Sequence, residues 1–420
     1  MNPGAMRQGL PEPEALKDVL AQFQRELPRL NRLWRYYQGK HDVLARSRLP
    51  GLPNQRLANG FPRYIAQVSA GYLIGEPARY DCPGEEAGAK ALRALYQAAD
   101  ADSVDLEAAV AQSVFGWGLT LCYIDEVGQA RLCALDPRSA FLVHDDTVAA
   151  LPLFGVRVLD MGGQRKITLY LKDQLAQYPD PQGLASGSPT RYPHPFGRVP
   201  MTEYRNGQDA QGDFEAVLPL IDAYDLMQSD RVNDRMQFSD ALLVLTGVMG
   251  IAEGITGEPG PGAMDRLRQE RTLALPDSEA KAEWLVKNPQ ERDVDVLRRA
   301  LAEDIHKFSM TPDFADERFA GNASGIAIKY KLFNLEQRVR MKERWFIRGL
   351  RERARVMAGY LEKKGRTALD ADKLCIRIPR RLPVNELERA QALSLLNGIL
   401  PEETLLDNAP ILPSETPHNN

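Results

Sequence analysis

Apolar residues recur at helical spacing through the N-terminal part of the chain. Pro28 interrupts this pattern, and proline removes a backbone donor, so we expect it to break or kink the helix at that point. Pro62 suits the first turn of a later helix, which Gly75 and Pro77 would end. Helices are therefore predicted over Leu16–Leu27, Arg29–Gln38, Pro62–Leu73, Ala87–Ala98 and Val104–Phe115.

From Leu119 the pattern changes to short runs rich in β-branched and apolar residues, separated by turn signals such as Asp136-Pro137 and Gly162-Gly163. Such runs predict an antiparallel meander. The stretch Pro179–Pro195 is rich in Pro, Gly and Ser and predicts a loop. Strands are predicted over Leu119–Ile124, Ala130–Leu135, Ala140–His144, Leu151–Leu159, Gln164–Leu171 and Val199–Tyr204.

Two long helices then flank a small insert. The first is predicted over Pro219–Ser239. The second is predicted over Asp293–Met310 with Asp293 as its N-cap. Between them, short apolar runs and a Gly/Pro loop predict a mixed α/β element, with strands at Ala241–Val248, Thr272–Leu275 and Ala282–Val286 and a helix at Ala263–Glu270.

The second of these helices repeats apolar residues at spacings of three and four. The residues of this stripe are Val294, Leu297, Leu301, Ile305 and Phe308. Because the stripe is narrow, it suits packing against neighbouring helices rather than burial on all sides.

Charge differs sharply between the helices before and after residue 311. Glu215–Asp240 holds six acids against two arginines, whereas a helix predicted over about Gly325–Lys364 holds twelve Lys or Arg against four Glu. Two interpretations remain open. The charges can form ordinary solvated faces. They can also line a passage whose acidic wall repels duplex phosphates, because many phosphate contacts would hold DNA rather than let it slide.

The C-terminal part predicts a strand at Leu374–Ile378, a last helix from Asn385 to about Asn397, and a disordered tail from Pro410. The overall formal charge of −4 gives no bulk attraction to nucleic acid. The longest apolar run, Ala241–Ala252, is short of the roughly 20 residues that cross a bilayer. No secretory signal opens the chain.

The cysteine pattern favours reduced thiols. The four cysteines lack metal-ligand spacing and the density of a disulfide scaffold, so a reducing cytoplasm fits.

Motifs for chemistry are sparse. The only Gly-Lys pair, Gly39-Lys40, lacks the spacing of a phosphate-binding loop, so no nucleotide-driven motor is predicted. His144, followed by Asp145 and Asp146, suits a turn better than a metal site. His194 is interpreted as a loop residue, and His306 as a solvated or inter-subunit polar contact. We predict no catalytic residue, metal or cofactor.

Four ordered stretches resemble the portal proteins of tailed bacteriophages of the long-tailed siphophage type. They are LANGFPRYIAQVSAGYLIGEP (Leu57–Pro77), HPFGRVPMTEYRN (His194–Asn206), LPLIDAYDLMQSDRVNDRMQFSDALLVLTG (Leu218–Gly247) and SGIAIKYKLFNLEQR (Ser324–Arg338). The segment NGILPEETLL (Asn397–Leu406) resembles the turn near that family's C-terminus. The resemblance covers about residues 30–410.

The resemblance implies an α+β phage portal fold assembled as a ring, with a wing, a two-helix stem, a small α/β clip and a helical crown. The implied segments are the wing (1–217), stem helix 1 (218–240), the clip (241–292), stem helix 2 (293–310), the tunnel loop (311–323), the long basic helix with a returning wing strand (324–382), and a short crown and tail (383–420). Many relatives continue beyond the point corresponding to Pro413, so a small crown is expected here.

The same resemblance supplies candidate site residues. Those implied for the channel and tunnel loop are Thr311, Asp313, Asp316, Glu317, Arg318, Gly321 and Asn322. Those implied for stem packing are Leu297, Leu301, Ile305 and Tyr224.

The resemblance also implies partners and a location. A ring of about twelve copies, or thirteen when assembled alone, would pass double-stranded DNA without sequence specificity. It would bind the large terminase subunit, then a head-completion adaptor, and also the major capsid and scaffold proteins. It would lie at the capsid portal vertex of the virion, after assembly in the host cytoplasm and without a membrane.

Two other classes stay open at this point: a metal-dependent enzyme acting on nucleic acid, and a capsid-associated structural protein without a channel.

Overall fold

The structure is a computed structural model that describes residues 9–162 except 51 and residues 164–178, 189–238, 242–246, 281–285, 291–314, 329–365 and 369–380. It also describes residues 1, 4, 6, 7, 394 and 395. The chain divides into two compact units. Unit 1 consists of Met1–Lys40, Gly60–Leu220 and Glu303–Asn420, and unit 2 consists of His41–Asn59 and Ile221–Ala302.

The helices of unit 1 agree closely with the predicted periodicity. They are α1 (Pro13–Tyr37), α2 (Phe61–Ile74), α3 (Glu86–Ala98), α4 (Ala101–Phe115) and α10 (Phe333–Lys363). The predicted start of the basic helix at Gly325 lies outside the described residues.

The predicted interruption at Pro28 is wrong, because α1 continues through it as one helix. Proline frees the carbonyl four residues earlier, here that of Gln24. Pro28 and Gln24 both lie on the exposed side of α1, where water can satisfy that carbonyl. The buried side, which includes Phe23 and Leu30, holds the helix together across the proline.

The strands of unit 1 form two main antiparallel sheets rather than one meander. The three-stranded sheet has the order β11-β4-β5, with β4 (Trp117–Ile124), β5 (Ala130–Leu135) and β11 (Met201–Arg205). The five-stranded sheet has the order β10-β9-β8-β7-β6, with β6 (Ala140–His144), β7 (Pro152–Met161), β8 (Gln164–Tyr170), β9 (Gln174–Tyr178) and β10 (Thr190–Pro193).

The turn at Asp136-Pro137 separates the two sheets. The Asp136 carboxylate accepts a hydrogen bond from the backbone N–H of Arg138, and the backbone carbonyl of Asp136 accepts one from the backbone N–H of Ser139. The chain therefore leaves β5 in a tight turn, and β6 pairs with β7 instead of β5. Sequence reasoning missed β9, and it missed β10 because that strand lies inside the predicted Pro/Gly/Ser loop.

Short strand pairs complete the described strands of unit 1. They are β1 (Met6–Arg7) with β2 (Leu10–Pro11) and β14 (Cys375–Arg377) with β3 (Arg79–Asp81). The second pair confirms that the predicted strand at Leu374–Ile378 returns to the N-terminal half of the chain.

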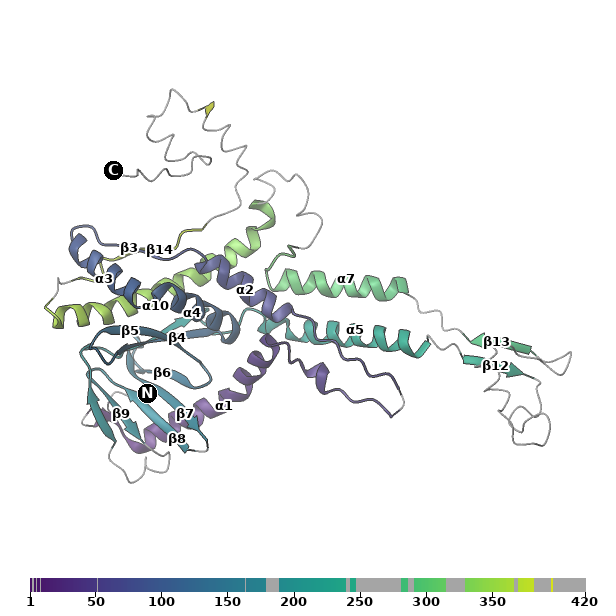
Figure 1. Ribbon diagram of the computed structural model, residues 1–420, viewed down its shortest axis with the longest axis horizontal. Coiled ribbons are helices and arrows are strands. Elements are labelled where there is room, and N and C mark those ends of the chain that lie inside the picture. Colours follow the sequence, from purple (N-terminus) through teal and green to yellow (C-terminus); the bar gives the residue numbers. More distant parts are fainter. Residues whose placement is uncertain are drawn as a thin grey trace, which may run out of the picture. The chain divides into compact units, whose positions relative to one another are not determined.

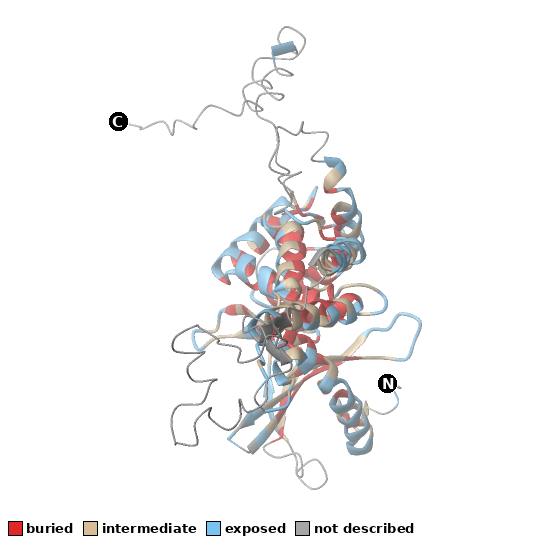
Figure 2. Ribbon diagram, turned by 90° about the vertical axis from the view of Figure 1, so that its right-hand side faces the viewer, coloured by how far each residue is buried: buried red, intermediate tan, exposed pale blue. Residues whose placement is uncertain are grey.

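Helix α1 lies along the five-stranded sheet (Figure 1). Leu16 packs into the core of that sheet, and the rings of Phe23 and Phe141 stack with centroids 4.4 Å apart. A larger core joins α2, α3, α4 and α10. Figure 2 shows its buried positions in red where these helices meet. Burial of these apolar side chains is the main source of stability.

Helix α10 crosses unit 1 and packs on β11. A side chain at Gly349 would place its Cβ 2.5 Å from the Tyr204 ring, so only glycine allows this close approach. The Tyr204 ring also packs against Phe346, with centroids 4.8 Å apart. Glycine thus lets α10 lie directly on the sheet without a gap.

Two buried ion pairs fix α10 further. Arg353 forms a fully buried pair with Asp105 of α4 and also donates to the Tyr80 hydroxyl. Lys342 donates to Asp213 at 2.9 Å, while Arg338 reaches the other oxygen of that carboxylate at 2.9 Å. A buried charge without its partner is costly, so these pairs fix the position of the helix strongly.

Unit 2 contains most of α5 (Leu218–Phe238) and α7 (Glu291–Phe308), together with a hairpin of β12 (Leu242–Thr246) and β13 (Lys281–Leu285). Helix α7 begins at Glu291, so the predicted N-cap at Asp293 is wrong. Asp293 lies in the first turn of α7 instead, where the positive end of the helix dipole stabilises its negative charge. The helix predicted at Ala263–Glu270 and the strand predicted at Thr272–Leu275 lie outside the described residues.

Within the part of the chain that the structure describes, no helix is long and apolar enough to cross a membrane. All four cysteines are free thiols.

Candidate functional site

The end of α7 is shaped by a specific turn. Met310 has a left-handed backbone, with φ of 52°. The N–H of Thr311 donates to the His306 carbonyl at 3.1 Å, and the N–H of Met310 donates to the Lys307 carbonyl at 3.2 Å. This pair of bonds satisfies carbonyls that a helix end leaves unpaired, and it reverses the chain sharply.

Side chains from α2 and α7 then hold the segment that follows this turn. The Tyr64 hydroxyl donates to the Pro312 carbonyl at 2.7 Å and accepts from the Phe314 N–H at 3.0 Å. The His306 ring lies against Tyr64, with centroids 5.9 Å apart, and its Nδ1 donates to the Thr311 carbonyl at 2.9 Å. The backbone is thus fixed as far as Phe314. We call residues 309–314 the loop root.

Helix α10 contacts the loop root from another direction. Arg338 donates to the Ser309 carbonyl and, at 2.6 Å, to the Asp213 carbonyl. Burial alone would raise the pKa of Asp213, but the charges of Arg338 and Lys342 hold it below its usual range. The carboxylate therefore stays ionised and holds both cations in place.

The residues predicted for the tunnel loop divide at the end of the loop root. Thr311 is buried and Asp313 is exposed, with its carboxylate 3.9 Å from the Nε2 of His306. The predicted residues Asp316, Glu317, Arg318, Gly321 and Asn322 lie outside the described residues. The prediction of a channel-facing loop therefore stays a prediction.

The four residues predicted for stem packing differ in exposure. Tyr224 and Ile305 are buried within their own chain, whereas Leu297 is 52% exposed and Leu301 is half-buried. The neighbouring Val296, which the sequence stripe did not include, is 67% exposed. Phe308 in the last turn of α7 is also 59% exposed, so the described part of α7 leaves apolar surface both in its middle and at its end.

Helices α5 and α7 meet through a polar contact. Arg298 of α7 hydrogen-bonds to the Tyr224 hydroxyl of α5 and to Asp295, and these bonds raise the pKa of Arg298. Figure 1 shows the two helices side by side.

Sequence reasoning missed how the segment His41–Asn59 binds α5. Nδ1 of His41 lies 2.5 Å from the Asp225 carboxylate, and both side chains are fully buried. The same carboxylate accepts from the N–H of Asn59 at 2.8 Å. Further along α5, Ser229 accepts from the N–H of Leu57 and Asn233 from that of Gln55.

A sequence signal for this contact existed. Asp225, Ser229 and Asn233 recur every four residues and so share one helix face, although the charge pattern alone places Asp225 on an acidic surface. The structure corrects that interpretation, because this face is covered by backbone amides of the same unit.

The basic helix needs a similar correction. Of its twelve Lys and Arg, Lys342 and Arg353 are buried and paired inside unit 1. Arg340 pairs with Glu336, and Arg355 pairs with Glu352 and Asp372. Much of the helix's charge therefore does not form a basic surface.

Two further histidines, His194 and His144, have different surroundings. Nε2 of His194 donates to the Leu171 carbonyl at 2.9 Å, which fixes the loop in which it was predicted to lie. His144 ends β6 beside Glu203 and lines a pocket. Over the described residues, no cluster of three or more His, Cys, Asp or Glu could hold a metal ion.

Comparison with known proteins assigns the family. The family model described as "Phage portal protein, SPP1 Gp6-like" matches residues 16–415. The portal protein of Bacillus phage SPP1 is 23% identical over 392 residues, which cover 86% of this chain and 74% of that protein. The chain therefore belongs to the SPP1 Gp6-like family of phage portal proteins. This confirms the resemblance and the portal function, and it places the chain among structural phage proteins.

Solved structures with a similar chain come from gene transfer agent particles. One, the virion of a native particle, has a TM-score of 0.48 and 12% identity over 91% of this chain and 93% of that chain. Another, the neck of a native particle computed with C12 symmetry, has a TM-score of 0.45 and 12% identity over 85% and 91%.

Proposed function

We propose that about twelve copies of this portal protein, or thirteen when assembled alone, close into a ring at one vertex of the capsid. Double-stranded DNA enters and leaves through its channel. Membership of the portal family carries this proposal. The exposed apolar residues Val296 and Leu297 support it, because a lone subunit would leave them in water.

The ring binds different partners in turn. The large terminase subunit docks during packaging and a head-completion adaptor replaces it, while the major capsid and scaffold proteins surround the ring. The subunits assemble in the host cytoplasm and end in the virion. The protein itself has no catalytic role, and the energy for transport comes from the motor.

Each segment has a role in this proposal. Residues 1–217 form the wing together with the α10 region, and α5 and α7 supply the stem. Residues 241–292 form the clip, and residues 383–420 form a short crown. The rigid loop root supports the assignment of a tunnel loop at 311–323, because a loop that contacts moving DNA needs a fixed base.

A deletion tests the tunnel loop. Removing residues 316–321 leaves the loop root intact, so we expect rings to form normally while DNA packaging or retention falls. The measurement is packaged DNA per particle, compared with particles in which Pro179–Ser188, a Pro/Gly/Ser-rich stretch of similar length, is shortened instead. Normal packaging by the 316–321 deletion would remove the loop from the mechanism of translocation.

Electron micrographs of the purified protein test the ring itself. A central hole is expected in end-on views. Particles without a hole would favour the capsid-associated structural protein instead.

A further inference from the structure

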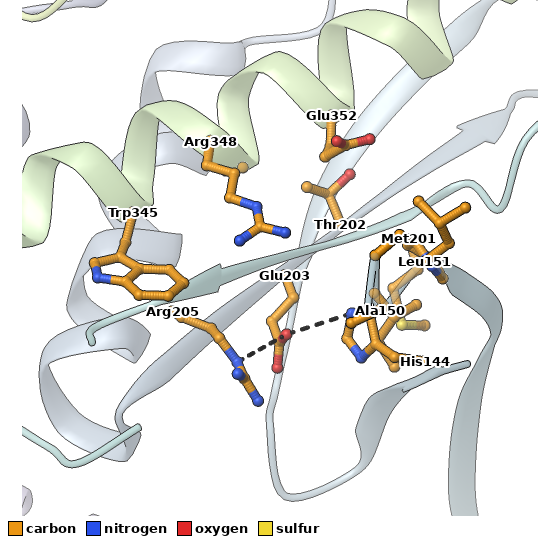
Figure 3. A pocket seen from close by; sticks show the side chains of 14 residues that line it. His144, Ala150, Leu151, Met201, Thr202, Glu203, Arg205, Trp345, Arg348 and Glu352 are labelled. Carbon is orange, nitrogen blue, oxygen red and sulfur yellow. Dashed lines mark ion pairs between the residues drawn. The ribbon is translucent and has the colours of Figure 1, made fainter. Parts of the chain in front are cut away.

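Unit 2 differs from unit 1 in the side chains that it leaves in water. In unit 1, the acid Glu203 of the pocket of about 270 Å³ that His144 lines is paired with Arg205 at 3.3 Å (Figure 3). In unit 2, both α7 and the segment His41–Asn59 present exposed apolar and charged side chains. We call this segment, residues 41–59, the arm.

The arm is held against α5 along both of its halves. Its second half bonds to the polar face of α5 described above. Its first half bonds further along the helix, because Arg46 donates to Asp230 at 2.7 Å and Arg48 donates to the same carboxylate. Arg56 joins the two halves by donating to the Leu44 carbonyl. The arm is therefore fixed in position within its own unit.

The arm exposes apolar side chains that its own unit does not cover. Leu49 is 75% exposed and Leu52 is 41% exposed, and a backbone hydrogen bond of 3.3 Å joins these two residues across a turn. Leu44 and Leu57 are also exposed. Exposed apolar side chains that gather on one segment mark an interaction surface.

The arm and α7 contact nearly opposite sides of α5. Helix α7 reaches Tyr224 through Arg298, whereas the arm bonds to Ser229 and Asn233. At 3.6 residues per turn, Ser229 lies about 140° and Asn233 about 180° around the helix from Tyr224. Figure 1 shows α7 and the connection between α1 and α2, which contains the arm, on either side of α5. Unit 2 therefore has two different faces.

The two faces lie at the same level along α5. Helix α5 runs toward the hairpin of β12 and β13, and α7 runs back from it. Arg298 of α7 lies beside Tyr224 of α5. Five residues back along α7 is Asp293, and five residues forward along α5 is Ser229, so these two lie about level. Arg56 precedes the residue that bonds to Ser229 and therefore lies about level with Asp293 on the other side of α5.

The arm carries an excess of positive charge. It holds three arginines and one aspartate. Arg46 and Arg48 share the single carboxylate of Asp230, so that carboxylate balances only one of them. Arg56 is exposed, and it makes no ion pair with a described residue.

The face of α7 carries the opposite charge at the same level. Asp295 pairs with both Arg298 and Arg299, but Asp293 is exposed and makes no ion pair with a described residue. About one turn further along the helix are the exposed side chains of Val296 and Leu297. Each face thus combines an unbalanced charge with apolar side chains, and the two charges are of opposite sign.

A closed ring of identical copies needs two different faces on each copy. The contact is heterologous, because one face of a subunit meets another face of the next, whereas a single self-complementary face stops at a dimer. The arm and α7 meet this requirement, since they lie on opposite sides of one helix, at one level, with matching apolar surface and opposite charge.

We propose that the arm of one copy binds α7 of the next copy in the ring. The leucines of the arm cover Val296 and Leu297, and Arg56 pairs with Asp293 of the neighbouring copy. This contact rests on the ring proposed above. A second copy is favoured over another protein as the partner because both complementary faces belong to the same chain, so every copy in a ring supplies one face to each neighbour.

Cross-linking between copies tests the contact. Ser47→Cys places a thiol on the exposed side of the arm, and Val296→Cys places one on α7. When every copy carries both changes, a short bis-maleimide should link it to two neighbours and give a ladder of multiples of the chain mass on a denaturing gel. Each change alone should give no more product than the wild-type protein, whose native thiols set the background.

A second pair of cysteines distinguishes the arm from α5 itself. Met236 of α5 is 46% exposed, so Met236→Cys with Val296→Cys tests direct packing of α5 on α7 of the next copy. A ladder from the arm pair supports the proposal whatever the α5 pair gives. No ladder from the arm pair, in samples that light scattering shows to be rings, would overturn the arm contact and leave the ring in place. A protein that stays monomeric would contradict the ring and the arm contact together.

Charge reversal tests the pair of Arg56 and Asp293. Arg56→Glu and Asp293→Arg each place like charges opposite one another, so the subunit concentration at half assembly should rise about tenfold in each variant. The double variant restores opposite charges and should return to within about threefold of the wild type. Recovery separates pairing from a loosened arm, because a charge on α7 cannot restore the hydrogen bond from Arg56 to the Leu44 carbonyl.

Arg344→Glu is the matched control, because it reverses an exposed arginine of α10, and it should change the same concentration less than about twofold. Losses in both single variants without recovery in the double variant would overturn the pairing. So would assembly of either single variant at the wild-type concentration.

Discussion

The long helices α10 and α7 differ in which kind of side chain they bury and which they leave exposed. Several cations of α10 pair with acids of their own unit, and Arg353 and Lys342 are buried. Helix α7 instead leaves Val296, Leu297 and Phe308 largely exposed, and Ile305 is the one residue that it buries among those whose burial the structure describes. From sequence alone, α10 suggests a charged surface, whereas the apolar stripe on α7 suits packing against neighbouring helices.

This difference indicates what each helix does. Charges that are paired inside a subunit hold its own elements together, whereas apolar residues left in water need a surface from outside. Helix α10 therefore orders unit 1, and we propose that α7 makes the contact between copies. Four predictions test this division, from the largest expected effect to the smallest.

The largest effect is expected from charge on the exposed face of α7. In Leu297→Asp with Leu301→Asp, assembly would bury two carboxylates without partners, and we expect rings to disappear at micromolar concentration. Light scattering gives the mass in solution. The control is Val127→Asp with Val148→Asp, because both valines are exposed outside α7. Rings that persist in the α7 variant would show that its apolar face points elsewhere.

Removing the buried cation of α10 should destabilise the subunit itself. Arg353→Ala leaves Asp105 buried and unpaired, and we expect the free energy of unfolding to fall by about 3–5 kcal/mol. Urea denaturation measures it. Arg344→Ala, which removes an exposed cation of the same helix, should cost less than about 0.5 kcal/mol. Similar losses in both variants would mean that the buried pair does not hold α10.

Acid should weaken unit 1 through His144. Its folded pKa of about 4 lies below the usual value, chiefly because of burial and then because of Arg205 and Arg348. Between pH 6.5 and pH 4 the unfolded chain binds a proton at His144 more readily than the folded protein does. The folded protein is therefore most stable, as far as His144 is concerned, above pH 6.5, and it loses stability as the pH falls toward 4. We expect a loss of about 1 kcal/mol, allowing for partial exposure.

Urea midpoints at pH 7 and pH 5 measure this loss. In His144→Asn, the part of the stability difference between pH 7 and pH 5 that His144 causes should disappear. In Arg348→Gln the His144 pKa should rise, because one of the charges of α10 has been removed. An unchanged pH dependence in His144→Asn would assign the titration to another group.

The smallest effect concerns the loop root. Tyr64→Phe removes both hydrogen bonds of the hydroxyl, each worth about 1 kcal/mol, so the Phe314 N–H should exchange about tenfold faster. Tyr330→Phe is the control, because Tyr330 is 77% exposed. Equal exchange rates in the two variants would show that Tyr64 does not fix the segment.

Much of the local structure could be predicted from the sequence. Helical periodicity located α2, α3 and α4 within three residues at each end, and turn signals located β5 and β6, because both patterns depend on neighbours in the chain. The route of the sheets could not be predicted, since the pairing of β11 with β4 joins residues about eighty positions apart. Pro28 was misjudged because the packing that holds α1 together comes from other elements.

The candidate site was predictable only where local sequence determines it. The family resemblance located α7 and the segment after it, but not the residues that fix that segment. Tyr64 is nearly 250 positions from Pro312, and Asp213 is more than 120 from both of its cations. Such polar contacts have no periodic signature, so a charge count treats Lys342 and Arg344 alike although only Lys342 is buried.

The mass of the purified, assembled protein tests the central claim most directly. Native mass spectrometry should give a single closed species at twelve or thirteen times the 46.9 kDa of one chain. A protein that remains a monomer or dimer at every concentration up to that found in an infected cell would contradict the account.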